Sequence, residues 1–100
     1  MADKKYKYSY AVVLHYYHDE DDTIKVIVPD IYNCAAFGVG HADAIRMIKY
    51  EIKQKLISSP ESCFEPNDPE MVKLNNPNDE VEIVSVNLDR EVKLKSFLEN

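Results

Sequence analysis

Residues 23–40 have the sequence TIKVIVPDIYNCAAFGVG and contain most of the signals that decide the fold of this chain. Over residues 23–29, apolar and β-branched side chains alternate with period two, which is typical of a β-strand with one buried face. Pro29 ends this strand because proline has no N–H group to donate to a sheet. The stretch therefore predicts a strand followed directly by a change in chain direction.

A turn and a short strand follow. Residues 30–33 are expected to turn, and Asn33 suits positive φ because asparagine tolerates the left-handed region better than other non-glycine residues. Residues 34–37 predict a third strand, which we expect Gly38 and Gly40 to stop. These are the only two glycines in the chain. Their place before a helix predicts a tight connection in which Cβ atoms would clash.

Upstream, residues 8–17 are rich in aromatic and β-branched types and alternate in the same way, which predicts the first strand. Two alternating runs around a short polar break predict a β-hairpin with an acidic tip. The break consists of His18, Asp19, Glu20, Asp21 and Asp22.

Downstream, His41–Ser58 has the spacing of an amphipathic helix. Gly40 is an acceptable N-cap, and Asp43 in the first turn is favourable at the positive end of the helix dipole. One face collects apolar residues three and four apart, which predicts that this face covers the sheet. These residues are Ala44, Ile45, Ile48, Ile52 and Leu56.

Met47, Tyr50 and Ile57 form a second, weaker stripe that points away from the first. One interpretation is that the segment after the helix covers this stripe. The other is a contact with a partner or with another copy of the chain, because exposed apolar side chains in a row require an explanation.

Residues 59–80 contain four of the five prolines and predict a long loop that is functional or mobile. Glu80–Leu88 resumes the alternation of a strand, and residues 89–100 form a tail, either a short helix or an extended arm. We expect a single domain over residues 1–100 with its core at about 8–88. The order β-β-β-α-β predicts an α+β two-layer sandwich, one helix on a mainly antiparallel four-stranded sheet. The last strand is expected beside the first and parallel to it, through a right-handed crossover.

The chain carries 12 basic and 18 acidic side chains, so its net charge is −6. This charge repels phosphate, so direct binding to nucleic acid is not expected, whereas a basic protein partner is favoured. No apolar run is typical of a signal peptide or a membrane span. We therefore expect no membrane association and a cytoplasmic location, where Cys34 and Cys63 stay reduced.

No pattern in the chain predicts an assembled catalytic or metal site. His15 and His18 lie beside carboxylates, but strand alternation separates them and no third ligand is evident. A nucleophilic Cys34 or Cys63 would need a base such as His41 within hydrogen-bonding distance, which the sequence does not provide.

Two other chemistries are also disfavoured. The segment Gly38-Val39-Gly40 lacks the third glycine and the Lys-Ser/Thr pair of phosphate-binding loops. Glu51 and Asp89 have no acidic partner on the first strand with which to hold magnesium for a nuclease. We expect no enzyme activity, no catalytic residue, no metal and no cofactor.

The run Val26-Ile27-Val28-Pro29-Asp30-Ile31-Tyr32-Asn33-Cys34, followed by Gly38 and by Asp43-Ala44 at the start of a helix, resembles the HicB-type antitoxin domain. The pattern of that family is a strand ending in Pro-Asp, a hydrophobic residue, often Pro-Gly-Cys, a glycine, and a capped helix with Glu-Glu-Ala. The resemblance covers residues 10–88 and implies a partial ribonuclease H-like fold that lacks the catalytic acids.

The chain also departs from that pattern. Tyr32 and Asn33 replace Pro and Gly, Gly40 replaces a Ser or Thr cap, His41 replaces an aliphatic residue, and Ala42 an acidic one. The tail is too short for the C-terminal DNA-binding segment usual in the family, so the resemblance does not imply operator binding.

The resemblance implies a protein-binding module that neutralises a small basic HicA-like ribonuclease toxin by covering it. The acidic tip (Asp19, Glu20, Asp21 and Asp22) and residues 59–80 are the candidate contact surfaces. It also implies a homodimer or higher homo-oligomer, in which the stripe of Met47, Tyr50 and Ile57 has a role. One alternative is a solitary HicB-like oligomer with a regulatory or small-ligand role and no toxin partner. Another is a remnant nuclease or thiol hydrolase.

Overall fold

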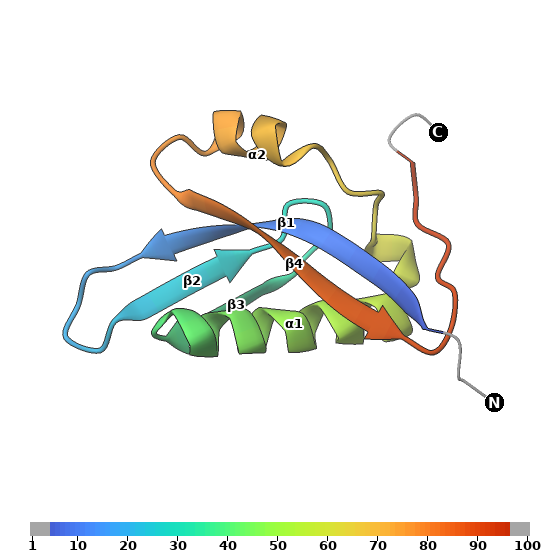
Figure 1. Cartoon of the computed structure of the whole chain (residues 1–100), viewed down its shortest axis with the longest axis horizontal. Helices are drawn as coiled ribbons and strands as arrows, with labels where there is room; N and C mark the ends of the chain where they lie inside the picture. The colour runs from blue at the N-terminus through green and yellow to red at the C-terminus, as the bar shows by residue number, and fades with distance from the viewer. Residues whose placement is uncertain (1–4, 97–100) are drawn as a thin grey trace.

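The computed structural model describes residues 5–96, which form one antiparallel sheet with helices on both sides. The elements are β1 (Tyr6–Tyr16), β2 (Thr23–Ile27), β3 (Ala35–Val39), α1 (His41–Ser58), the 3₁₀ helix η1 (Pro60–Ser62), α2 (Pro69–Asn75) and β4 (Glu80–Leu88). The strand order is β3-β2-β1-β4, and Figure 1 shows α1 and α2 on opposite sides of the sheet. The predicted sandwich of one helix on four strands is confirmed, and α2 is an addition to it.

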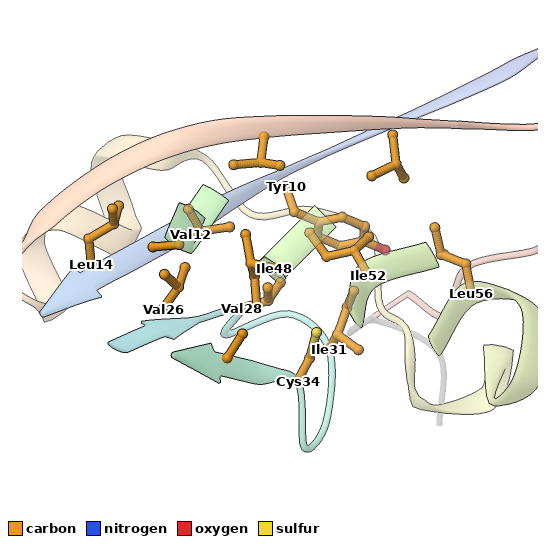
Figure 2. Packing of buried hydrophobic residues seen from close by; sticks show 14 of the residues in the cluster. Tyr10, Val12, Leu14, Val26, Val28, Ile31, Cys34, Ile48, Ile52 and Leu56 are labelled. Atoms are coloured by element: carbon orange, nitrogen blue, oxygen red, sulfur yellow. The ribbon is translucent and has the colours of Figure 1, made fainter. Parts of the chain in front are cut away.

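The main core lies between α1 and the sheet (Figure 2). Even-numbered residues of β1 point towards α1, because successive side chains of a strand alternate between its two faces. Ile48, Ile52 and Leu56 are fully buried as predicted, but Ile45 is only half-buried at the flank of the stripe. From the sheet and the following turn, the labelled core residues are Tyr10, Val12, Leu14, Val26, Val28, Ile31 and Cys34.

The connection from β3 to α1 is as tight as the glycine pair predicts. A Cβ atom at Gly38 would lie 2.4 Å from the Cα atom of Ala44, so only glycine fits there. Gly40 has φ 84° and precedes the first residue of α1. The expectation that Gly38 stops the strand is wrong: it lies inside β3, because its missing side chain lets the helix approach the strand while the ladder continues.

The direction of β4 corrects the sequence-based prediction. β4 pairs with β1 in antiparallel fashion, from Leu14 opposite Glu80 to Tyr6 opposite Leu88. The reason is the path of residues 59–79. After α1 ends, this segment returns along the sheet on the side opposite α1, so the chain enters β4 from the other end.

Residues 59–80 are not a plain loop. The Asp68 carboxylate accepts a hydrogen bond from the N–H of Glu70 at 2.9 Å, and Pro69 occupies the first turn of α2. This is a standard way to start a helix. Val72 of α2 then packs into a second, smaller apolar cluster with Ala11, Val13 and Val81.

The turn after β2 anchors the segment that follows α1. Asn33 has φ 55°, which confirms its predicted left-handed conformation. Asp30 is buried, and its carboxylate accepts hydrogen bonds from the backbone N–H and the side-chain amide of Asn67 at 2.9 and 2.7 Å. Its backbone carbonyl accepts from the N–H of Phe64 at 2.9 Å. Asp30 therefore fixes residues 64–67 against the sheet.

Within the tail, residues 89–96 are an extended arm rather than a helix. Val92 and Leu94 pack against the main core, and the N–H of Lys95 donates to the carbonyl of Cys63 at 2.9 Å. The remainder of the expected tail, 97–100, and residues 1–4 lie outside the described residues. Within residues 5–96, no helix is long and apolar enough to cross a membrane.

Candidate protein-interaction surface

The side of the sheet opposite α1, which we call the outer face, is covered only in part. α2 lies over the outer side chains of β1 and β4, where Val72 contacts the cluster of Ala11 and Val13. Odd-numbered residues of β2 and β3 point to the same side and have no helix above them. This part of the outer face is open to solvent.

The open part is apolar. Four large side chains form what we call the outer patch: Tyr17 is 46% exposed, Ile27 38%, Phe37 55% and Val39 64%. The solvated face of an antiparallel sheet normally carries polar side chains. Four large apolar groups on adjacent strands therefore form an exposed apolar patch of the kind that occurs at interaction sites.

Ring contacts order the outer patch. The rings of Tyr17 and Phe37 stack with centroids 6.4 Å apart and planes 25° apart, and the Lys25 Nζ lies 5.8 Å from the centre of the Phe37 ring. Both rings are held by neighbours of their own chain, so little conformational entropy is lost when a partner covers them.

The acidic tip lies directly beside the outer patch. Asp19, Glu20, Asp21 and Asp22 are all exposed, as expected for the tip of a hairpin. Asp19 accepts a hydrogen bond from the N–H of Thr23 at 2.9 Å, and this bond lowers the pKa of the Asp19 carboxyl. The Asp22 carbonyl accepts from the N–H of Gly40 at 2.9 Å, which ties the tip to the start of α1.

Further polar contacts gather at the same end of the sheet. His15 Nδ1 lies 2.9 Å from Asp79 Oδ1, and His41 bonds to Glu82. The hydroxyl of Tyr16 donates to Glu80 at 2.8 Å. Desolvation and this carboxylate raise the pKa of Tyr16 to about 12.

The two histidines considered as metal ligands do not converge. His15 sits on the outer face beside Asp79, whereas His18 lies after β1 and stacks on Tyr16 with ring centroids 6.2 Å apart. In the described part of the chain, no three His, Cys, Asp or Glu side chains are grouped so as to hold a metal ion.

The thiols are buried and separated from His41. Burial raises the pKa of Cys34 to about 12 and that of Cys63 to about 11, so both are protonated at neutral pH. Cys34 precedes β3 and His41 follows it, which puts about five strand residues, or roughly 17 Å, between them. Glu51 and Cys63 lie near Cys34, but His41, the base weighed for the thiols, lies at the other end of β3, and Asp89 follows the end of β4.

The helix stripe named in the sequence is split. Met47 is half-buried against the core, while Tyr50 is 59% and Ile57 44% exposed. Ile57 lines a shallow groove of about 410 Å³ at the end of α1, together with Pro60, residues 90–93 and Lys95. α2 packs on the far side of the sheet, so it does not cover Tyr50.

The outer patch was not predicted as a site, although its signal is in the sequence. Tyr17, Ile27, Phe37 and Val39 occupy the second face of their strands, and in a half-exposed sheet these positions would be polar. Sequence alone does not show which part of that face α2 covers, because α2 itself was not predicted.

A scan against protein-family models gives no match, and a search of curated proteins gives no relative. The resemblance to HicB domains therefore rests on the motif residues alone.

Proposed function

We propose that this protein is a HicB-like antitoxin-type binding module that neutralises a small basic HicA-like ribonuclease by covering it. One observation carries the proposal: an apolar outer patch lies directly beside the four exposed carboxylates of the acidic tip. An apolar centre with a charged rim is the usual composition of a protein-binding surface.

The two parts of this surface have different roles. The acidic tip attracts a basic partner and orients it during encounter, so it governs the association rate and its salt dependence. The outer patch, with Phe37 and Tyr17 at its centre, is desolvated in the complex and governs how long the complex lasts. The chain's own role is occlusion, without any catalytic step.

The proposal includes a cytoplasmic location. Cys34 and Cys63 are both free and buried, which fits a reducing compartment.

The acidic tip is tested by binding measurements with a small basic HicA-like protein encoded next to this chain. Neutralising Asp19, Glu20, Asp21 and Asp22 together, as Asn or Gln, removes four exposed attractions. Each exposed attraction is weak and screened by salt, but with all four removed the affinity measured by calorimetry at low salt should fall roughly 30-fold. Asn keeps an acceptor oxygen for the Thr23 N–H, and it tolerates the positive φ of Asp22.

The matched control neutralises four exposed carboxylates elsewhere, at Glu61, Glu65, Glu70 and Glu91. It changes the net charge equally and should alter the affinity by less than about threefold. Equal losses in both variants would mean that net charge, or the second candidate contact surface at residues 59–80, attracts the partner as much as the acidic tip does. A wild-type chain that does not bind or inhibit the basic protein would exclude the proposed function.

The alternative is a solitary HicB-like oligomer with a regulatory or small-ligand role and no toxin partner. The edge strand β3 favours this alternative, because residues 34–40 carry no charge and no proline that would prevent a second copy from pairing with it.

A further inference from the structure

β3 forms one edge of the sheet, and its outward backbone groups can be assigned. The N–H of Gly40 donates to Asp22, and the N–H of Val28 donates to Cys34 at 3.0 Å, so even-numbered residues of the β3 segment bond to β2. Odd-numbered residues of an antiparallel edge then point their N–H and C=O groups away from the sheet. These are Ala35, Phe37 and Val39.

One outward group is already occupied. Asp43 accepts the N–H of Val39 at 2.9 Å, which agrees with this assignment. The N–H groups of Ala35 and Phe37 have no acceptor within residues 5–96. The backbone N–H groups of Ala35 and Phe37 are therefore available to a partner strand, whereas the N–H of Val39, next to the start of α1, is not.

This edge lacks the features that normally prevent strand association. Residues 34–40, CAAFGVG, contain no charge and no proline, although 30% of the chain is charged. Natural edge strands are usually protected by lysine, proline or a covering segment. An unprotected edge in a chain of net charge −6 is the place where a second copy meets least repulsion.

The helix below the edge adds apolar area. Asp43 touches Val39 at one end of β3, and Glu51 lies near Cys34 at the other. Met47 is midway between them on the same row of the helix, so it lies beside the middle of β3. Tyr50, one turn away, is on the outward side of this row and is 59% exposed.

We propose that a second copy of the chain pairs with β3 in antiparallel fashion, about a two-fold axis at Phe37. The N–H of Phe37 in each copy donates to the Phe37 carbonyl of the other, and the N–H of Ala35 donates to the Val39 carbonyl. The Val39 N–H stays with Asp43. The two sheets become one, and the two α1 helices lie side by side with Met47 and Tyr50 between them.

A second copy fits this edge better than the basic partner does. The edge offers no charge for a basic protein to recognise, whereas a strand pairing with itself about a two-fold axis is automatically complementary. Dimerisation leaves the acidic tip free but shares Phe37 with the outer patch. Self-association of the chain alone tests this inference, and binding of the basic protein tests the proposed function, so the failure of one is distinguishable from the failure of the other.

Analytical ultracentrifugation of the full chain tests the pairing. The wild type should sediment with twice the mass of one chain. Phe37→Lys places a charge on each side of the axis and should weaken self-association by at least about tenfold. Ile83→Lys is the matched control: Ile83 is 61% exposed on the strand at the opposite edge, and this change should alter self-association by less than about threefold.

Amide hydrogen exchange of the wild type gives a second readout that needs no variant. The N–H groups of Ala35 and Phe37 should exchange slowly at high protein concentration and quickly on dilution, while that of Ile83 stays fast throughout. A monomer at all concentrations, a dimer insensitive to Phe37→Lys, or protection of Ile83 in place of Phe37 would overturn the inference. So would protection of Ala35 and Phe37 that appears only when the basic protein is added.

Discussion

At the scale of single residues, Gly38 shows how one missing side chain sets the distance between two elements. α1 lies so close to β3 that the backbone of Ala44 occupies the space where a Cβ atom of residue 38 would be. Backbone cannot rotate out of the way as a long side chain can, so the whole helix would have to shift.

Gly38→Ala should therefore lower the free energy of unfolding by roughly 3 kcal/mol. The measurement is the urea midpoint of the full chain. Ala35→Val is the control, because it adds bulk on the exposed side of the same strand and should change the stability by less than about 0.5 kcal/mol. Equal stability of Gly38→Ala and wild type would mean that α1 does not approach β3 this closely.

The two buried thiols predict a loss of stability in alkali. Burial raises the pKa of Cys34 to about 12 and that of Cys63 to about 11, from an ordinary value of 9.0. The folded state thus keeps both protons while the unfolded state releases them above pH 9. The contribution of each thiol is complete below pH 9 and is lost as the pH rises towards the pKa of the folded state, about 11 for Cys63 and about 12 for Cys34.

At pH 10, the contribution of each thiol to the free energy of unfolding should be roughly 1 kcal/mol smaller than at pH 8, as measured from urea midpoints. Cys34→Ala lowers the stability at every pH because it leaves a cavity, but it should reduce the alkaline slope. Unchanged slopes in both Cys34→Ala and Cys63→Ala would contradict the burial of the thiols as the cause.

At the scale of elements, the turn after β2 organises the chain after α1. The Pro-Asp pair that supports the family resemblance has a structural role, because the Asp30 carboxylate is buried and holds Asn67. This contact joins residues 37 positions apart in sequence. It directs the chain to the outer face, where α2 forms.

Asp30→Ala should lower the free energy of unfolding by about 2–3 kcal/mol, since it leaves the N–H and the amide of Asn67 without their acceptors. Amide exchange at Asn67 should accelerate more than at Ile48 in the main core. Asp30→Asn retains one acceptor oxygen and should lie between Asp30→Ala and wild type. If Asp30→Asn proved as destabilising as Asp30→Ala, the negative charge, rather than an acceptor oxygen alone, would be required.

The elements that the sequence predicted well are those with a local signal. The bounds of α1 and β4 agree with the structure because the apolar period and the flanking turn residues both lie within the segment. α2 has its own start signal in Asp68 and Pro69, but the three other prolines of residues 59–80 made the whole segment resemble a loop. The direction of β4 depends on Asp30 and Asn67, a contact that no local pattern encodes.

At the scale of the whole molecule, one long helix and one short helix cover a sheet that has two apolar faces. α1 covers one face, and α2 covers only the outer side chains of β1 and β4. The outer patch is the part of the second apolar face that neither helix covers. Period-two alternation predicts two faces for each strand, but how much of each face is covered depends on the tertiary path of residues 59–79. The candidate surface therefore becomes visible only in the folded molecule.

The most direct test of the proposed binding surface is an NMR titration of the ¹⁵N-labelled chain with a small basic HicA-like protein, the class of partner that we propose. We predict that amide signals of residues 17–27, which include the acidic tip and part of the outer patch, shift or broaden first. Signals of the exposed helix residues Lys49 and Lys53 should stay in place. Shifts confined to α1, or to the groove beside Ile57, would contradict the account.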